Sequence, residues 1–411
     1  MSEDSRPTWA DARRLSYGAG LSGAGSATAA SAGAAELVAL GDAAGRRLAR
    51  DVVALCDLPH YVSSAMDGWA VSGAPPWRVV DAESLASGES LGSGECRAIV
   101  TGAALPPGAT AVLRSEHAVV TRDGDGESVT TTAGARADEP RDGEHMRLAG
   151  TEATTGQLLI ASGTLLNPAH VALAASAGHD ELAVAPRPRV RLVLTGDEVV
   201  ASGIPASGRV RDSFGPVLPS LIAGLGGIVA QAIHLDDSRQ AMIDALSADP
   251  AGHELIVTTG STGTSSADHL RPALRQLGAD ILIDGIRMRP GGPSLLARLD
   301  DGRFVVGLPG NPLAAILALL TLAEPLLAAL TGAPAPRTHR VEVGAELAGR
   351  ASTSLLVPYR LEDGRAAAST WRGSAMMRGL ADSDGVLVCP PDGVATGASA
   401  DAFALPWGAT R

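Results

Sequence analysis

The feature that most constrains the fold is a regular alternation of strand-like and helix-like segments between residues 188 and 330. The runs "VRLVLTG", "IVAQAIHL" and "ELIVTTG" have the composition of buried strands, and each is followed by a segment whose apolar residues have helical spacing. Five apolar residues share one face of the first such helix, namely Val217, Leu218, Leu221, Ile222 and Leu225. This alternation predicts a doubly wound α/β domain on a parallel sheet, over residues 181–333. Such sheets bind ligands at the carboxyl ends of their strands.

Segments on both sides of this domain have β-like patterns. Residues 47–145 contain short β-prone runs such as "CRAIVTG" and a hairpin turn in "RDGDGE", and they predict a β-rich domain. Residues 31–46 together with 146–180 predict a linker domain that includes a helix capped by Asn167. A C-terminal β domain is expected over residues 334–411, where the Pro-rich "TGAPAPRTH" gives way to short strands.

Two stretches of the chain have a strongly biased amino-acid composition. Residues 1–30 are rich in Gly, Ala and Ser, lack the blocks of a signal peptide, and predict a mobile tail. The most apolar run, "PLAAILALLTLAEPLL", is interrupted by Glu324 and Pro325 before it reaches the roughly 20 residues that a bilayer requires. It therefore predicts a buried helix, and we expect no membrane partner.

Charge and cysteine content exclude two further classes. The 411 residues carry a formal net charge of -12, which argues against a nucleic-acid partner because phosphate backbones bind basic surfaces. A bound phosphate would instead be held by backbone amides or by a metal ion. The three cysteines, Cys56, Cys96 and Cys389, are odd in number and widely spaced. They favour a reducing, cytoplasmic compartment over a disulfide framework.

Three strand ends of the α/β domain lead into turns that suit anion binding. The turns are "LTGDE", "TTGSTGTSSAD" and "GLPGNP", which end at Glu198, Asp268 and Pro312. Glycine lets the backbone approach a ligand, and helix N-termini supply unpaired N–H groups. We expect one ligand site lined by Thr195, Gly196, Asp197, Thr259, Gly260, Ser261, Thr262, Gly263, Pro309, Gly310, Asn311 and Pro312. Each turn alone is equally compatible with a plain strand-to-helix connection.

Carboxylates at the same edge suggest a hard cation, because such ions prefer oxygen ligands. Asp197, Glu198, Asp268 and one of Asp236 and Asp237 lie at or just after strand ends. The alternative is structural. Asp237 would then cap the helix that follows it, and Asp268 would complement the dipole of its own helix.

Two turns of the β-rich domain are unusual. Asp67 and Gly68 follow Met66 in "SSAMDGWAV", and Thr101 precedes a proline corner in "VTGAALPPGATAVL". Either turn is compatible with a structural role or with presenting its polar side chain to a ligand. The sequence has no GxxxxGK[ST], no HExxH and no GxGxxG after a strand, so the commonest NTPase, metalloprotease and dehydrogenase sites are not predicted.

Several stretches, taken together and in order, resemble a known family. They are "LPHYVSSAMDGWAV", "VTGAALPPGATAVL", "LTGDEVV", "GRVRDSFGPVL", "MRPGGP", "GLPGNPLAA" and "TWRGSAMMRGLADSDGVLVCPP". The resemblance is to the molybdopterin molybdenumtransferases, which include the MoeA protein of bacteria and the E domain of gephyrin. It covers nearly the whole chain after about residue 30.

The resemblance implies an elongated four-domain protomer that forms a homodimer. The α/β domain would be a MogA-like molybdopterin-binding domain, accompanied by a β-rich inserted domain, a linker domain and a C-terminal β domain. The implied transferase reaction is the Mg2+-dependent insertion of molybdate into the dithiolene of adenylylated molybdopterin, with release of AMP. The adenylylated substrate implies a molybdopterin adenylyltransferase among the partners.

The same resemblance assigns roles to individual residues. The catalytic residues would be Asp67, Thr101, Glu198, Asp237 and Asp268. Of these, Glu198, Asp268 and Asp237, or its neighbour Asp236, would hold the metal ion. Pro290 and Gly291 of "MRPGGP" join the cofactor-binding residues.

The chain departs from the family pattern at four places. Residues 259–265 are "TGSTGTS" where the family has "SGGVSVG", and Gly292 replaces the lysine of "PGKP". His145 replaces the aspartate of "GED", and Phe214 replaces the asparagine of "DSN".

These departures leave three functions open. The first is an active molybdenumtransferase in which Arg287 or Arg289 replaces the charge of the missing lysine. The second is a binding protein for molybdopterin without insertase activity, which the missing lysine favours. The third is a molybdopterin adenylyltransferase, because "TTGSTG" resembles the corresponding loop of the MogA domain.

Overall fold

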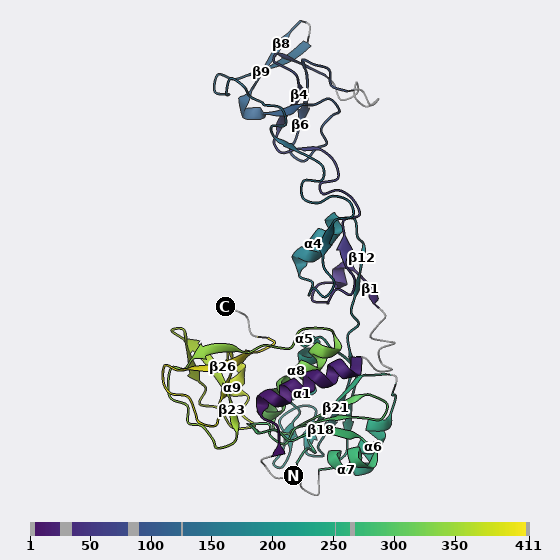
Figure 1. The fold of residues 1–411 in the computed structure, drawn as a ribbon, viewed down its shortest axis with the longest axis vertical. Helices are drawn as coiled ribbons and strands as arrows, with labels where there is room; N and C mark the ends of the chain where they lie inside the picture. Colours follow the sequence, from purple (N-terminus) through teal and green to yellow (C-terminus); the bar gives the residue numbers. More distant parts are fainter. Residues whose placement is uncertain are drawn as a thin grey trace. The chain divides into compact units, whose positions relative to one another are not determined.

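The computed structural model describes residues 5–24, 35–80, 90–124, 126–250, 252–263 and 268–407. The chain divides into two compact units (Figure 1). The small unit is Leu37–Val184, and the large unit combines Met1–Glu36 with Ala185–Arg411. The linker and β-rich segments therefore share one unit, and the α/β and C-terminal segments share the other.

A six-stranded sheet in the order β7-β4-β6-β5-β9-β8 dominates the small unit. Its strands are β4 (Gly68–Ser72), β5 (Trp77–Val79), β6 (Glu95–Ile99), β7 (Ala111–Arg114), β8 (Ala118–Asp123) and β9 (Gly126–Thr131). The side chains of Trp77, Cys96 and Leu113 are buried in its core. Strands β8 and β9 form the expected antiparallel hairpin.

Short strand pairs and one helix complete the small unit. They are β1 (Glu36–Ala39) with β12 (Glu181–Val184), β2 (Val52–Val53) with β11 (Leu158–Ile160), β3 (Ser63–Ser64) with β10 (Met146–Arg147), and α4 (Pro168–Ser176). Asn167 caps α4 as expected, because its side chain accepts from His170 N. The pairings of β1 with β12 and of β2 with β11 join the two chain segments of this part of the unit.

The large unit is built on a second six-stranded sheet, in the order β16-β13-β17-β21-β20-β18. Its strands are β13 (Arg189–Thr195), β16 (Ile228–Leu235), β17 (Leu255–Thr259), β18 (Asp280–Asp284), β20 (Leu295–Arg298) and β21 (Phe304–Leu308). The first four strands in spatial order are parallel, as expected. Strands β20 and β18 are antiparallel additions, so the sheet is mixed rather than wholly parallel.

Helices cover both faces of this sheet, which confirms the doubly wound fold. They are α5 (Leu218–Gly224), α6 (Arg239–Ser247), α7 (Leu270–Gln276) and α8 (Pro312–Leu330). Along β13, Leu192 packs in the core that contains α5 and α8, whereas Val193 packs in the core that contains α6 and α7. This alternation follows the two-residue period of a strand.

Helix α8 is buried nearly all round. Among the described residues it is the one helix long and apolar enough to cross a membrane, yet 89% of its most apolar window is buried inside the protein. The expected buried helix is therefore confirmed. Pro325 lies inside the helix, which continues to Leu330. Burial of the flanking residues offsets the roughly 3 kcal/mol that an internal proline costs.

The expected mobile tail is wrong for the segment that forms α1 (Trp9–Ala24). This helix packs along α8 (Figure 1). A Cβ atom at Gly20 of α1 would lie 2.7 Å from the Ala329 Cβ of α8. The small residues of α1 therefore allow close helix packing rather than flexibility. Residues 1–4 and 25–34 lie outside the described part of the chain.

Polar contacts fix α1 in its place. The Trp9 indole donates to the Thr321 hydroxyl at 3.1 Å, and Trp9 stacks on Phe403 with ring centroids 5.5 Å apart. Arg13, 7% exposed, donates to the Glu324 carboxylate at 2.8 Å. Burial raises the pKa of Glu324, and the Arg13 charge opposes that shift. The one acidic residue of α8 is thereby paired.

A third sheet, in the order β19-β23-β25-β26-β22 with β24 beside β23, forms the C-terminal part of the large unit. Its strands are β19 (Met288–Arg289), β22 (His339–Glu342), β23 (Ser354–Glu362), β24 (Arg365–Ala368), β25 (Gly385–Cys389) and β26 (Ser399–Ala404). The remaining elements are β14 (Val199–Val200), β15 (Val210–Arg211) and α9 (Arg378–Ala381), with short 3-10 turns at Leu40–Asp42 and Ser115–His117. Because β19 belongs to the α/β segment, this sheet connects the two parts of the unit.

The α1 contact makes a stability prediction. Replacing Trp9, 4% exposed, with alanine should lower the free energy of unfolding by about 3–5 kcal/mol, because the change leaves a cavity beside α8. The matched control is Leu15→Ala on the exposed face of α1, which should cost about 0.5 kcal/mol or less. Chemical denaturation followed by circular dichroism measures both. Equal effects would contradict the packing of α1.

Candidate active site

The carboxyl ends of four parallel strands lie at one edge of the large unit's sheet. The three glycine-containing turns follow β13, β17 and β21, which are direct neighbours, so the turns lie together as expected. The Thr195 hydroxyl donates to Thr259 O at 2.7 Å, and Gly260 N donates to Leu308 O at 2.9 Å. Hydrogen bonds therefore join the three strand ends.

Glycine is needed where the turns approach one another. Gly260 has a φ of 77°, and a Cβ atom there would lie 2.7 Å from the Thr195 hydroxyl. A Cβ on Gly310 would lie 3.8 Å from Gly260 Cα. Thr259 and Thr262 are only 1% and 3% exposed, so their side chains belong to the core and a ligand would meet main chain there.

Two aspartates from neighbouring strand ends are bonded to each other's backbone. Asp237 N donates to Asp197 Oδ1 at 3.0 Å, and Asp197 N donates to Asp237 Oδ2 at 3.4 Å. Ser238, not Asp237, caps α6, since its hydroxyl accepts from Ala241 N. The capping role considered for Asp237 is therefore wrong, and the structure pairs Asp237, rather than Asp236, with Asp197.

The other two acidic residues fold back onto their own turns. Both carboxylate oxygens of Glu198 lie 3.1 Å from the position of a Cβ on Gly196, so a side chain at residue 196 would collide with them. Asp268 Oδ1 accepts from Gly263 N at 2.7 Å, which closes the turn after β17. Residues 264–267 of this turn lie outside the described part of the chain.

The expected metal ligands do not form a preformed cage. Across the described segments, no three His, Cys, Asp or Glu side chains lie close enough to hold one ion. Glu198, Asp237 and Asp268 thus do not form a three-ligand group among the described residues. A magnesium ion commonly uses one or two carboxylates together with substrate phosphates, and the side-by-side carboxylates of Asp197 and Asp237 fit that mode.

Arg271, which sequence reasoning missed, ties the turns together. Its guanidinium donates to Thr262 O, to Gly263 O at 3.2 Å and to Pro293 O at 2.9 Å, while Asp284 anchors it at 2.6 Å. It therefore joins the turn after β17 to the "RPGGP" loop. A lone arginine in the first turn of α7 gives no sequence signal for this role.

A cavity of about 890 Å³ lies against the turn after β21. Its walls include Pro290, Gly291, Gly292, Pro309 and Asn311. Five arginines also line it, namely Arg6, Arg287, Arg289, Arg350 and Arg372. The described lining residues include no carboxylate. The arrangement is suited to a strongly anionic group, because guanidinium groups bind oxyanions through several N–H donors at once.

Two polar side chains in the wall of this cavity lack an expected hydrogen bond among the described residues. Asn311 precedes Pro312 at the start of α8, but its side chain makes no capping hydrogen bond, contrary to the usual role of asparagine there. The Arg287 Nε is screened from solvent and has no hydrogen-bond partner among the described residues.

Asp67 and Thr101 are joined in the small unit. Asp67 Oδ1 accepts from Thr101 N at 2.6 Å and from the Thr101 hydroxyl at 2.9 Å. These two bonds lower the pKa of the exposed Asp67 carboxyl, so it is ionised at neutral pH. Only glycine fits at residue 68, since a Cβ there would lie 2.0 Å from Leu113 O. The turn thus presents Asp67 while its neighbour packs against β7.

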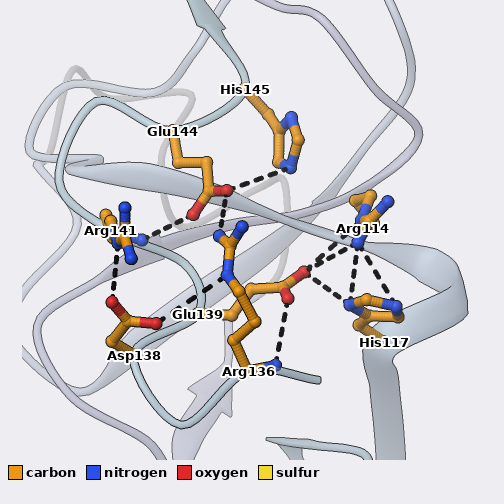
Figure 2. Close-up of polar contacts among 8 residues, drawn as sticks. All are labelled: Arg114, His117, Arg136, Asp138, Glu139, Arg141, Glu144 and His145. Atoms are coloured by element: carbon orange, nitrogen blue, oxygen red, sulfur yellow. Dashed lines mark hydrogen bonds and ion pairs between the residues drawn. The ribbon is translucent and has the colours of Figure 1, made fainter. Parts of the chain in front are cut away.

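A charged network braces the strand beside this turn (Figure 2). Arg114 pairs opposite Gly68, and both Arg114 and His117 converge on Glu139, whose Oε1 lies 2.5 Å from His117 Nδ1. Glu139 is 5% exposed. Burial pushes its pKa up, but His117 and the Arg136 amide outweigh burial and hold the pKa below its ordinary value. Arg136 also contacts Glu144.

Comparison with known proteins places this geometry in a family. The "MoeA N-terminal region (domain I and II)" matches residues 19–178, and the "Probable molybdopterin binding domain" matches residues 191–329. "Molybdopterin molybdenumtransferase 2" of Mycobacterium tuberculosis is 33% identical over 328 residues, which cover 74% of this chain and 78% of the relative. The chain belongs to the molybdopterin molybdenumtransferase family. The enzyme of that name from Staphylococcus aureus is 29% identical over 313 residues, 72% of this chain and 71% of the relative.

Solved structures of molybdenumtransferase relatives have the same fold. The molybdopterin biosynthesis MoeA protein of Pyrococcus horikoshii aligns with a TM-score of 0.70 at 23% identity, covering 90% of this chain and 94% of that one. A second structure from the same organism aligns with a TM-score of 0.72 at 20% identity, covering 97% and 100%. At these identities the likeness concerns the fold alone.

The departures from the molybdenumtransferase pattern have structural counterparts. A Cβ at Gly292 would lie 3.0 Å from Met288 O, so a lysine would be crowded here. Both arginines expected to replace its charge do line the cavity. His145 has a φ of 59°, and its Nε2 lies 3.8 Å from Glu144 without a hydrogen-bond partner among the described residues. Ser261 has a φ of 52°, and Phe214 packs against the core around α8.

The Glu139 network predicts a pH effect. Glu139→Gln should lower the free energy of unfolding of the small unit by about 3 kcal/mol at neutral pH, because Arg114 would lose a buried partner. Since the folded-state pKa is lowered, the native contribution is present above the unfolded pKa of Glu139 and disappears as the pH falls through the folded pKa. Denaturation curves from neutral to acid pH should show this loss in the native protein and less of it in the variant.

The control for this variant is Glu127→Gln, which removes an exposed ion pair with Arg122 from the same unit. It should change the stability by less than about 1 kcal/mol. Similar losses in the two variants would show that Glu139 is not a buried structural charge.

Proposed function

We propose that this chain inserts molybdate into the dithiolene of adenylylated molybdopterin and releases AMP. Family membership supports the reaction, and the observation that carries the proposal is the arginine-lined cavity beside the strand-end turns. Molybdate is a tetrahedral dianion. A cavity with five guanidinium groups and no carboxylate among its described lining residues suits such an ion.

The strand-end turns would hold the pterin and nucleotide parts of the substrate. Their glycines let main-chain N–H groups approach phosphate oxygens, and the turn after β21 leads directly into α8, whose N-terminus has a positive dipole end. Pro309 and Asn311 belong both to this turn and to the cavity wall. The two subsites would therefore share one wall, which brings the dithiolene close to the bound oxyanion.

A magnesium ion would be held by Asp197 and Asp237, with Glu198 and Asp268 at the same edge. When bound, the ion would neutralise charge on the substrate's pyrophosphate. The Asp197 and Asp237 carboxylates also accept hydrogen bonds from each other's backbone N–H groups, which holds the ends of β13 and β16 together. Asp67, held ionised by Thr101, would act in the same reaction.

We further propose a homodimer. Five leucines of the small unit each expose more than half of their surface and are candidates for such a contact. They are Leu37, Leu55, Leu148, Leu158 and Leu165. A molybdopterin adenylyltransferase is the proposed donor of the adenylylated substrate, and the proposed compartment is the cytoplasm.

The test is AMP release from adenylylated molybdopterin with molybdate and Mg2+. Release that requires both supports the proposal, and formation of molybdenum cofactor must accompany it. Tight binding without AMP release would instead identify a molybdopterin-binding protein. ATP-dependent adenylylation of free molybdopterin would identify an adenylyltransferase, the reading that "TTGSTG" favoured.

Asp268 provides a specific prediction. Asp268→Asn should lower the rate of AMP release at least about 100-fold. The change removes the negative charge of a carboxylate that would lie beside the magnesium ion at the substrate's pyrophosphate. The thermal midpoint should change little, since asparagine keeps an oxygen to accept from Gly263 N. A large drop in the midpoint with unchanged turnover per folded molecule would show that Asp268 is only structural.

The cavity provides a second prediction. Arg350→Ala should raise the KM for molybdate about tenfold or more while leaving the KM for the pterin substrate nearly unchanged, because one charged donor is lost from the oxyanion subsite. Arg360→Ala, an exposed arginine on the same strand as three lining residues, is the control. Equal effects of both changes would argue against a specific molybdate subsite.

A further inference from the structure

The N-terminal segment reaches the arginine-lined cavity. Pro7 O accepts from Arg287 N at 2.9 Å, and Thr8 forms a parallel bridge with Arg287. Arg6, one residue earlier, lines the cavity. Four of the five lining arginines therefore come from the region after residue 285, and the fifth comes from the beginning of the chain.

The start of α1 determines where Arg6 lies. The Thr8 hydroxyl accepts from Asp11 N at 3.1 Å and donates to Asp11 Oδ2 at 2.7 Å, which caps the helix at its first turn. Trp9 follows at once and is anchored in the core by stacking on Phe403 and bonding to Thr321. Arg6 lies two residues before Thr8, the residue that caps α1, so its backbone has little freedom to leave the cavity wall.

The stem of Arg6 lies on the backbone of the loop that carries Gly292. The Cδ and Nε atoms of Arg6 lie 3.1 Å from the position of a Cβ on Gly285, so a side chain there would crowd this stem. Gly285 also has a φ of 84°, which favours glycine. Gly292 O accepts from Ile286 N at 2.8 Å, which holds the next residue against the same loop. Arg6 therefore enters the cavity beside the position that has lost its lysine.

We propose that Arg6 binds the tetrahedral dianionic group in this cavity and supplies the positive charge that Gly292 does not provide. This inference rests on the proposed function for the identity of the group, which is either molybdate itself or a phosphate of the substrate. A side chain at residue 292 would be crowded by Met288 O, whereas Arg6 lines the cavity from the N-terminal segment. The oxyanion subsite is thereby completed by the N-terminal segment.

The test measures binding of molybdate alone and of inorganic phosphate alone to the full chain by isothermal titration calorimetry. Arg6→Gln should weaken binding about tenfold or more, as expected for loss of a charged donor. Arg6→Lys should recover most of that loss, because the charge is kept. The matched control is Arg14→Gln, which removes an exposed arginine of α1 that pairs only with Asp11 among the described contacts.

A structural role would have a different signature. If Arg6 only anchors the N-terminal segment, then the ligand-free melting temperature falls in Arg6→Gln, and Arg6→Lys does not restore affinity; that pair of results overturns the inference. So does unchanged affinity for both anions, or an equal loss in Arg14→Gln. A loss confined to molybdate assigns Arg6 to the free oxyanion, and a loss confined to phosphate assigns it to the substrate's phosphate; either result supports the inference.

Failure of this inference and failure of the proposed function can be told apart. AMP release by the native chain with unchanged turnover in Arg6→Gln rejects the role of Arg6 and leaves the reaction in place. Oxyanion binding that depends on Arg6, without any AMP release, rejects the reaction and leaves the role of Arg6 in place. A native chain that binds neither anion overturns the role of Arg6 regardless of its activity.

Discussion

Burial of α8 is the constraint on which the large unit depends. A helix that is apolar around its circumference is stable in water only when other elements cover each of its faces. Here the sheet covers one face, α1 covers a second, and side chains from the C-terminal sheet such as Leu356 and Phe403 share the same core. Because α8 begins at the turn after β21, the elements that bury it also surround the candidate site. Stability and site geometry are thus set by the same contacts.

Acidic and basic side chains occupy different regions of the candidate site. Carboxylates occupy the ends of β13 and β16 and the turn after β17, whereas arginines surround the cavity beyond β21. Arg271 stands between these regions and bonds to main-chain oxygens on both sides. A ligand that spans the edge would meet a cation-binding region at one end and an anion-binding region at the other. A substrate with a metal-associated pyrophosphate and a separate oxyanion has that distribution of charge.

Local periodicity was sufficient to predict the doubly wound core, the hairpin of β8 and β9 and the cap at Asn167, because each depends on neighbours in sequence. The helix α1 was missed since its Gly and Ala residues resemble a flexible tail until a partner helix is known. The arginine cavity was missed for a related reason: Arg6, Arg287, Arg350 and Arg372 come from three distant segments and share no pattern. The capping interpretation of Asp237 failed because Ser238 is the better placed acceptor.

Strand β19 has a consequence for how a ligand enters and leaves. Its two residues pair with Ser354 and Leu355 of β23, and Ser354 N donates to Arg287 O at 3.0 Å. The opposing walls of the cavity are therefore parts of one hydrogen-bonded ladder rather than two bodies joined by a hinge. Swinging β19 and β23 apart would break main-chain hydrogen bonds, so we expect the ligand to enter and leave without separation of these two strands. The backbone positions of Arg287 and Arg289 are then fixed relative to β23 before an anion arrives.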